Sequence, residues 1–181
     1  MVSPPATLRL IGLDPGLRRT GWGVIDMTGQ YLKYIADGVA SSDDKESLAV
    51  RLGQLWHQLN AVIEEWRPDE AAVEETFVNK NPASTLKLGM ARGVVLLVPS
   101  LKGVRVAEYS PNLVKKSIVG SGHADKIQVQ MMVRRLLPGA LATQADAADA
   151  LAVAICHAHH AASSRALTRV AAGIGQVGIG R

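Results

Sequence analysis

The order of extended and helical segments along the chain is the feature that most limits its possible folds. Residues 8–13, 22–27 and 31–39 are three successive runs rich in strand-forming residues. The dipeptide Thr28-Gly29 between the second and third runs indicates a tight hairpin turn. Because such short connections join antiparallel neighbours, we expect the chain to open with three antiparallel strands.

A helix and a further strand follow these runs. Apolar residues recur at helical spacing over 48–66, which predicts an amphipathic helix that ends before Pro68. Residues 70–76 form a short strand-like run, and because a helix precedes it we expect this strand to lie parallel to the first. A second helix at 82–98 and a short strand at 103–109 complete a mixed five-stranded sheet. The predicted fold class is α/β, with helices flanking the sheet.

The helix at 82–98 carries apolar residues on two of its faces. They form two stripes, Leu86, Met90, Val94 and Leu97 on one face and Leu88, Ala91, Val95 and Val98 on the other. A helix that is apolar nearly all round is either fully buried or partly buried against another subunit. The pattern alone favours neither interpretation.

The composition is that of one globular domain. The chain has 181 residues, 48% of them hydrophobic and 20% charged, with no continuous apolar run long enough to cross a bilayer. Two further helices, at 125–137 and 144–163, complete a domain that we place at residues 1–163. We expect residues 164–181 to form a mobile tail that contains glycine and arginine. The single cysteine, Cys156, excludes an internal disulfide, so we expect a cytoplasmic protein.

Charge is distributed unevenly along the chain. Residues 1–75 carry 7 basic and 12 acidic side chains, whereas residues 76–181 carry 13 basic and 4 acidic ones, for a net charge of +4. A basic half of this kind attracts polyanions such as nucleic acids through the release of counterions. Charge alone is equally compatible with a solvated basic surface that has no partner.

Acidic residues lie where two of the predicted strands end. Asp14 directly follows the first apolar strand, and Glu74 lies near the end of the strand at 70–76. Because these strands are predicted to be parallel neighbours, their carboxylates would lie side by side. Strand alternation puts Glu74 and Glu75 on opposite faces, so only one of them can join Asp14, and the residues alone do not decide which.

Two more acidic residues lie in the predicted helix at 144–163. Asp146 and Asp149 stand three apart and therefore share one helical face. Acidic residues near a helix N-terminus can serve simply as favourable capping charges. A divalent cation is the fuller explanation, because like charges at this spacing repel each other and carboxylate oxygens are ligands that Mg²⁺ prefers.

Together these observations indicate a metal-dependent nuclease. Four carboxylates from two strands and a helix could hold two Mg²⁺ ions in the geometry that suits attack of water on a phosphodiester. Lys115, Lys116 and Lys126 would attract the phosphate backbone. Phe77 follows Glu74 closely enough to stack on an exposed base, although this single phenylalanine could equally belong to the core.

Four stretches of the sequence resemble the RuvC family of bacterial Holliday-junction resolvases, within the RNase H-like superfamily. They are IGLDPGLRRTGWGVI (11–25), VEETFVNKNPASTLKLGMARGV (73–94), VKKSIVGSGHADKIQVQ (114–130) and QADAADALAVAI (144–155). The resemblance implies an RNase H-like fold. The catalytic and metal-binding residues that it implies are Asp14, Glu74, Asp146 and Asp149, which selects Glu74 over Glu75.

The resemblance also implies an activity and partners. The activity is that of an endonuclease that resolves four-way DNA junctions by paired symmetric nicks in recombination and repair. Each active site would use two Mg²⁺ ions, for which Mn²⁺ can substitute, and would leave 5′-phosphate and 3′-hydroxyl ends. Phe77, Lys115 and Lys126 would contact the DNA. The implied partners are a second copy of the chain, bound through the helix at 82–98, and the branch-migration proteins RuvA and RuvB.

Two other functions remain open on the sequence alone. The same fold could carry a nuclease of RNA or of simple DNA flaps, or the chain could be a DNA-binding module without activity. Clustered carboxylates would repel a phosphate backbone in a pure binding module. An enzyme is therefore the better interpretation.

Overall fold

The structure, a computed structural model, describes residues 6–75, 81–140 and 144–174, with side chains up to residue 161. Strands and helices alternate after an opening run of three strands, as the sequence predicts. The elements are β1 (Thr7–Asp14), β2 (Arg19–Thr28), β3 (Tyr31–Ser41), α1 (Leu48–Trp66), β4 (Glu70–Glu74), α2 (Pro82–Leu101), β5 (Arg105–Tyr109), α3 (Pro111–Val119), α4 (Lys126–Leu136) and α5 (Ala145–Ile174).

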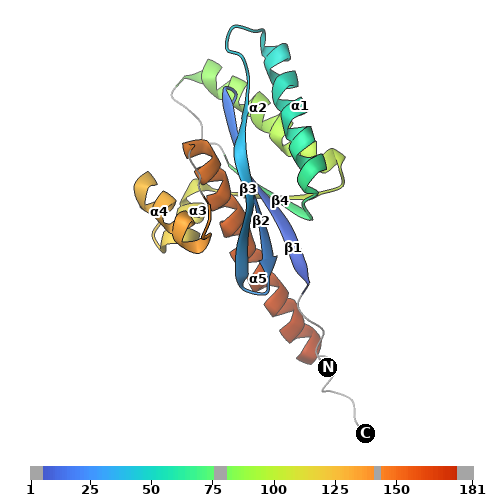
Figure 1. Cartoon of the computed structure of the whole chain (residues 1–181), viewed down its shortest axis with the longest axis vertical. Helices are drawn as coiled ribbons and strands as arrows, with labels where there is room; N and C mark the ends of the chain where they lie inside the picture. Colours follow the sequence, from blue (N-terminus) through green and yellow to red (C-terminus); the bar gives the residue numbers. More distant parts are fainter. Residues whose placement is uncertain (1–5, 76–80, 141–143, 175–181) are drawn as a thin grey trace.

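The five strands form one mixed sheet in the order β3-β2-β1-β4-β5 (Figure 1). β1 pairs antiparallel with β2, and β2 with β3, whereas β4 lies parallel to both β1 and β5. The predicted sheet and its antiparallel opening are confirmed. The hairpin turn between β2 and β3 lies one residue later than predicted, because Thr28 pairs with Tyr31 and leaves Gly29 and Gln30 at its centre. Gly29 has a φ of 63°, a left-handed conformation that glycine adopts without strain.

Helices cover both faces of the sheet (Figure 1). α5 lies across one face, with α3 and α4 beside it, and its Leu151 and Ile155 share one fully buried core with Leu10 and Ile25 of the strands. α1 and α2 cover the opposite face, over a second core. The sheet is thus the middle of three layers. Side chains of β1 and β4 that face α5 are therefore held between packed elements.

Glycines let α5 approach the sheet closely. A Cβ placed on Gly12 of β1 would overlap the backbone oxygen of Ala150, and one on Gly21 of β2 would overlap the backbone oxygen of Asp146. Any larger residue at these two positions would force the helix away from the strands. The first turns of α5, and with them Asp146, are therefore fixed against the ends of β1 and β2.

α2 presents one of its two apolar stripes to the core and the other to solvent. Ala91, Val95 and Val98 are buried against the α1 side of the sheet, whereas Leu86 is 62% and Leu97 is 50% exposed. Of the two interpretations left open above, full burial is therefore excluded within this chain. The exposed stripe is a surface that a second protein could cover.

α2 is also the one helix among the described residues that is long and apolar enough to cross a bilayer, by length and composition alone. Partly exposed helices of globular proteins pass the same test. Arg92 in the middle of α2 forms an ion pair with Glu108 of β5, and the buried stripe packs on α1. Both contacts place α2 in the globular domain.

One helix was not predicted, and the ends of two others differ from prediction. α3 was not expected as a helix, although Ser110 caps its N-terminus, Pro111 takes its first turn and Gly120 ends it in a left-handed conformation. α2 does not stop before Pro99 but continues to Leu101, and the N–H groups of Lys102 and Gly103 donate to the carbonyls of Pro99 and Ser100 at its end. The described backbone of α5 continues past residue 163 to Ile174.

Candidate active site

Asp14 and Glu74 are the last residues of the neighbouring parallel strands β1 and β4. Leu13 pairs with Val73 in the sheet register, so the two carboxylates follow side by side at one edge of the sheet. Both side chains are partly buried. Alternation turns the exposed Glu75 to the opposite face. The structure therefore brings Glu74, and not Glu75, to Asp14.

The two carboxyl groups interact strongly. Burial raises the pKa of Asp14 to about 8, and the charge of Glu74, the charge of Asp149 and a hydrogen bond with Glu74 act in the same direction. Asp146 adds a smaller contribution of the same sign. Burial also raises the pKa of Glu74, although the hydrogen bond that it accepts from Asp14 lowers it. A proton on Asp14 thus relieves the repulsion among carboxylates that lie close together.

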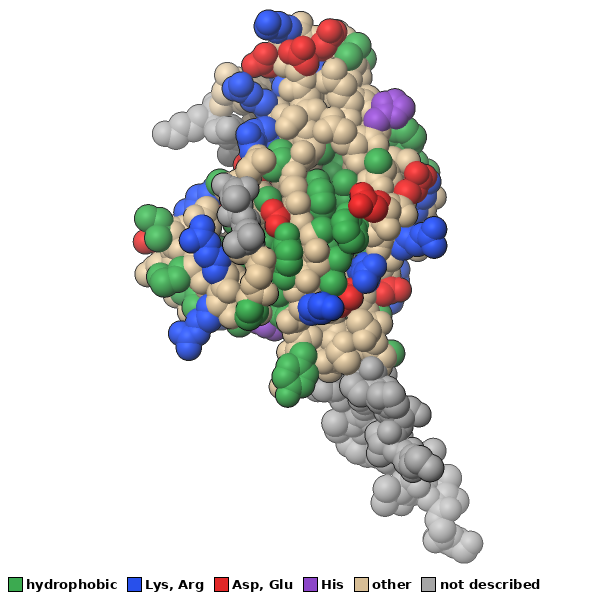
Figure 2. All heavy atoms as spheres, in the orientation of Figure 1, with side chains coloured by type: hydrophobic (Ala, Val, Ile, Leu, Met, Phe, Trp, Pro, Cys, Tyr) green, Lys and Arg blue, Asp and Glu red, His purple; other side chains and the backbone are tan. Residues whose placement is uncertain are grey.

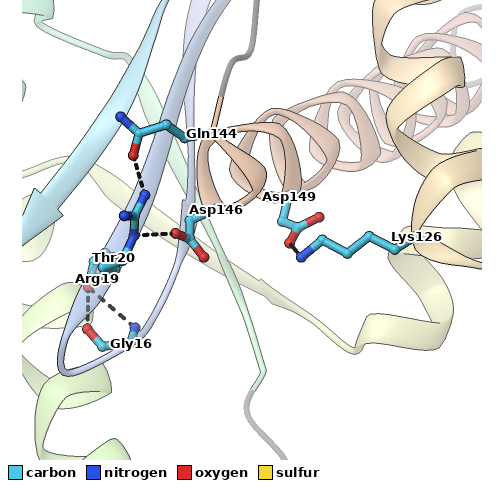
Figure 3. A network of polar contacts seen from close by, with 7 residues as sticks. All are labelled: Gly16, Arg19, Thr20, Lys126, Gln144, Asp146 and Asp149. Atoms are coloured by element: carbon cyan, nitrogen blue, oxygen red, sulfur yellow. Dashed lines mark hydrogen bonds and ion pairs between the residues drawn. The ribbon is translucent and has the colours of Figure 1, made fainter.

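The beginning of α5 carries the other two acidic residues, Asp146 and Asp149 (Figure 3), and both lie close enough for their charges to act on Asp14. Asp146 lies in the first helical turn, where the positive end of the helix dipole favours an anion. Each carboxylate is paired with a cation. Arg19 Nε donates to Asp146 Oδ2 at 2.6 Å, and Lys126 Nζ donates to Asp149 Oδ2 at 2.6 Å. The Arg19 guanidinium also donates to the side-chain oxygen of Gln144.

A cavity of about 260 Å³ opens beside Glu74 and Asp149. Lys115 of α3 and Lys126 of α4 line it together with the two carboxylates. Figure 2 shows that further Lys and Arg side chains lie on the surface of the lobe formed by α3 and α4. The remaining basic residues of these two helices are Lys116, Arg134 and Arg135. A negatively charged ligand would thus meet lysines at the point where it reaches the carboxylates.

The donor set fits a hard divalent cation, because such ions take carboxylate oxygens. As the side chains stand, no three acidic, histidine or cysteine groups in the described part of the chain surround a common point. Asp146 and Asp149 face Arg19 and Lys126 instead (Figure 3). The proton that Asp14 retains marks an excess of negative charge, which a cation would relieve. The four residues fit a divalent cation once the α5 carboxylates exchange their present partners.

The turn between β1 and β2 carries Arg19 to this site. Thr20 is fully buried, and its hydroxyl donates to the carbonyl of Gly16 at 2.8 Å and accepts from the N–H of Gly16 at 3.3 Å. Ser42 Oγ donates to the carbonyl of Leu17 at 2.5 Å. These bonds fix the backbone on both sides of Arg19. Sequence reasoning missed this residue, because nothing in the pattern distinguishes it from the adjacent Arg18, which pairs with Asp44 instead.

A second polar cluster lies between α5 and the sheet, where the sequence suggested no function. His157 Nε2 lies 2.9 Å from Glu70 Oε2, and its Nδ1 lies 2.8 Å from the Tyr109 hydroxyl. Arg105 donates to the other oxygen of Glu70 at 2.6 Å. Burial raises the pKa of Tyr109 to about 12. These groups satisfy one another's hydrogen bonds and tie α5 to β4 and β5.

The remaining predicted site residue, Phe77, lies outside the described residues. Its role stays a prediction.

Solved structures share this arrangement of strands and helices. RuvC of Thermus thermophilus in complex with a Holliday junction substrate aligns with a TM-score of 0.81 and 33% identity, over 87% of this chain and 96% of that one. The yeast mitochondrial Holliday junction resolvase Ydc2 aligns with a TM-score of 0.63 at 15% identity, over 86% of this chain and 82% of that one, and shares the fold. The chain thus has the RNase H-like fold of the resolvases.

The sequence comparisons identify one family among these resolvases. The family model described as crossover junction endodeoxyribonuclease RuvC matches residues 10–157. The RuvC of Rhodospirillum rubrum is 61% identical over 93% of this chain and 100% of its own length. The RuvC of Paramagnetospirillum magneticum is 62% identical over 91% of this chain and 99% of its own. The chain belongs to the crossover junction endodeoxyribonuclease RuvC family.

Proposed function

We propose that this chain is a divalent-metal-dependent endonuclease that resolves four-way DNA junctions by paired symmetric nicks. The observation that carries the proposal is the convergence of Asp14, Glu74, Asp146 and Asp149 from β1, β4 and α5 beside a lysine-lined cavity. Two findings support the choice of substrate. They are membership of the RuvC family and the likeness to the Thermus thermophilus RuvC that was solved with a Holliday junction bound.

The four carboxylates would act together as the metal-binding and catalytic residues. Two Mg²⁺ ions bound to them, or Mn²⁺ in their place, would supply an activated water and stabilise the leaving oxygen. Asp14 must lose its proton to ligate, and the packed ends of β1 and β4 keep it next to Glu74. α5 fixes Asp146 and Asp149 three residues apart on one face. Cleavage would leave a 5′-phosphate and a 3′-hydroxyl, which a ligase can join.

The basic residues would hold the DNA. Lys115 and Lys126 line the cavity beside the carboxylates, so a phosphate bound by them would lie next to the metal-binding oxygens. The sequence places Phe77 just after Glu74, and we propose that it stacks on a base at the junction.

The proposed assembly is a homodimer that joins through the exposed stripe of α2. A twofold dimer would present two such sites to two strands of the junction, which has a matching symmetry. RuvA and RuvB are the proposed partners in branch migration. The proposed setting is DNA recombination and repair in the cytoplasm.

The test is the variant Asp14→Asn on a synthetic four-way junction with Mg²⁺. Because a neutral amide holds a divalent cation much more weakly than a carboxylate does, we expect cutting to fall about a hundred- to a thousandfold while junction binding is retained. Asp44→Asn, at an exposed acidic residue of the β3–α1 connection, is the matched control and should cut normally. Undiminished cutting by Asp14→Asn would remove the proposed catalytic role.

Substrate class needs a separate comparison, of a junction, a linear duplex, a flap and an RNA hairpin of the same sequence. Preferred cutting of the flap or the RNA would replace the proposal with another nuclease on the same fold. Tight junction binding with no cutting in either Mg²⁺ or Mn²⁺ would indicate a binding module.

A further inference from the structure

Arg19 lies beside the proposed metal site, and although it belongs to the stretch 11–25, the proposed function gives it no role. Its Nε lies 2.6 Å from Asp146 Oδ2, and the guanidinium also contacts Gln144, the residue just before α5 (Figure 3). Its side chain remains 45% exposed, although Asp146 is only 31% exposed. The pair therefore stands at the rim of the site, within reach of solvent and ligand.

Hydrogen bonds fix the backbone that carries Arg19 next to the beginning of α5. The buried hydroxyl of Thr20 and the hydroxyl of Ser42 hold the turn from both sides. Gly21 allows β2 to touch the backbone of Asp146. Arg19 is thus held beside Asp146, whereas Arg18, one residue earlier, is 76% exposed and lies 3.7 Å from Asp44.

The contact has a direct consequence for metal binding. The Arg19 guanidinium occupies one oxygen of the Asp146 carboxylate at 2.6 Å, and its positive charge repels a divalent cation bound to the same carboxylate. Metal binding at Asp146 must therefore weaken or break the Arg19 contact. The same holds for Lys126 on Asp149, so both α5 carboxylates carry a tethered cation.

We propose that Arg19 is a tethered counter-ion that competes with divalent metal for Asp146 and transfers to a DNA phosphate when substrate binds. The proposal rests on the proposed nuclease function. A guanidinium suits this exchange, because its planar array of donors fits a phosphate as well as a carboxylate. DNA binding then draws Arg19 away from Asp146 and leaves this carboxylate to the metal. Metal binding in turn releases Arg19 to contact a DNA phosphate. The two ligands consequently bind with positive coupling, which is reciprocal.

The first test measures metal binding without DNA. Ca²⁺ is the probe, titrated calorimetrically into full-length wild type, Arg19→Gln and Arg19→Lys after removal of metal with EDTA. Removing a partly exposed competing charge should tighten Ca²⁺ binding about two- to fivefold in Arg19→Gln, and Arg19→Lys should stay near wild type. Arg18→Gln makes the same charge change in the same turn without touching Asp146, and its Ca²⁺ affinity should match wild type. Circular dichroism in EDTA checks that each variant is folded.

The second test measures the coupling between metal binding and DNA binding, as the ratio of the Ca²⁺ affinity with a four-way junction to the affinity without it. The junction is examined afterwards to verify that it was not cut. Wild type should show a ratio above one that falls toward one in Arg19→Gln. In Ca²⁺, the slope of log affinity against log salt concentration for junction binding should also decrease in Arg19→Gln by about the amount of one phosphate contact.

Two results would overturn the proposal. Weaker Ca²⁺ binding by Arg19→Gln would mean that Arg19 positions Asp146 for the metal, and unchanged binding and coupling would mean that the contact has no role in either. Both are distinct from failure of the proposed function, in which wild type itself neither binds divalent metal nor cuts the junction.

Discussion

At the scale of single residues, the sequence could predict the acidic residues of the site, but it could not predict which basic side chains pair with them. Asp14 follows an apolar strand and Asp146 shares a helical face with Asp149, and such positions follow from strand ends and helical periodicity. Glu74 was ambiguous, because the neighbouring Glu75 has the same chemistry and only the strand register separates them. Arg19 was missed, since a long side chain in a turn can reach several partners and only the tertiary packing selects one.

The raised pKa of Asp14 predicts a pH-dependent stability in the metal-free protein. The folded state holds this proton up to a pKa of about 8, far above that of an unfolded aspartate. Its stabilising effect is therefore complete below the unfolded pKa, near pH ~4, and is lost as the pH rises through about 8. Asp14→Asn stays neutral and can still donate to Glu74, so in EDTA its melting temperature should exceed that of wild type at pH ~8.5 by at least about 2–4 °C, and by much less at pH ~5.

Thermal melts of both proteins across this range, in EDTA, are the measurement. Glu74 has a raised pKa as well and contributes with the same sign, so the variant keeps a smaller slope of its own. If the two melting curves shift in parallel at every pH, Asp14 does not titrate in this window.

At the scale of elements, the strands and the longer helices follow from local signals, whereas their ends depend on tertiary contacts. The bounds of β1, β4 and the amphipathic helix α1 were predicted within a few residues, because the spacing of apolar residues shows which face packs on the core. α3 was missed because its basic residues obscure a short apolar stripe, of which Val114 and Ile118 are buried. Its caps, Ser110 and Gly120, were legible signals for it.

The close approach of α5 to the sheet predicts the effect of a single methyl group. In Gly21→Ala the added Cβ would overlap the backbone oxygen of Asp146, so helix or strand must move. We expect a loss of about 1–3 kcal/mol of stability, as for other overpacked sites, together with reduced cutting because Asp146 moves with the helix. Urea denaturation and junction cleavage measure the two effects.

Gly53→Ala is the control for that substitution. Gly53 lies inside α1, and a Cβ there meets nothing within 4 Å. Alanine is the better helix former, so this variant should gain about 0.5–1 kcal/mol and cut normally. Equal effects of the two variants would contradict the claim that contact between β2 and α5 positions the site.

At the scale of the whole molecule, the layered fold assigns each face of the sheet a separate task. The α5 face carries the carboxylates and, through α3 and α4, the lysines of the cavity. The opposite face carries α1 and α2, and α2 leaves one apolar stripe in solvent. The sequence could show that α2 has two apolar faces, but only the packed structure shows which of them the chain itself covers.

The exposed stripe predicts how assembly and cutting are linked. Leu86 and Leu97 are 62% and 50% exposed, so glutamates in the double variant Leu86→Glu/Leu97→Glu would be solvated in a monomer and buried in the proposed interface. We expect the double variant to be a folded monomer by light scattering, whereas the proposal predicts a dimer for wild type. On a supercoiled plasmid with an extruded cruciform, the product should shift from linear to singly nicked DNA, because one site acts without its symmetric partner. Val50→Glu, at a 45% exposed valine of α1, should leave both assembly and products unchanged. A dimer that survives the double substitution would place the interface on another surface.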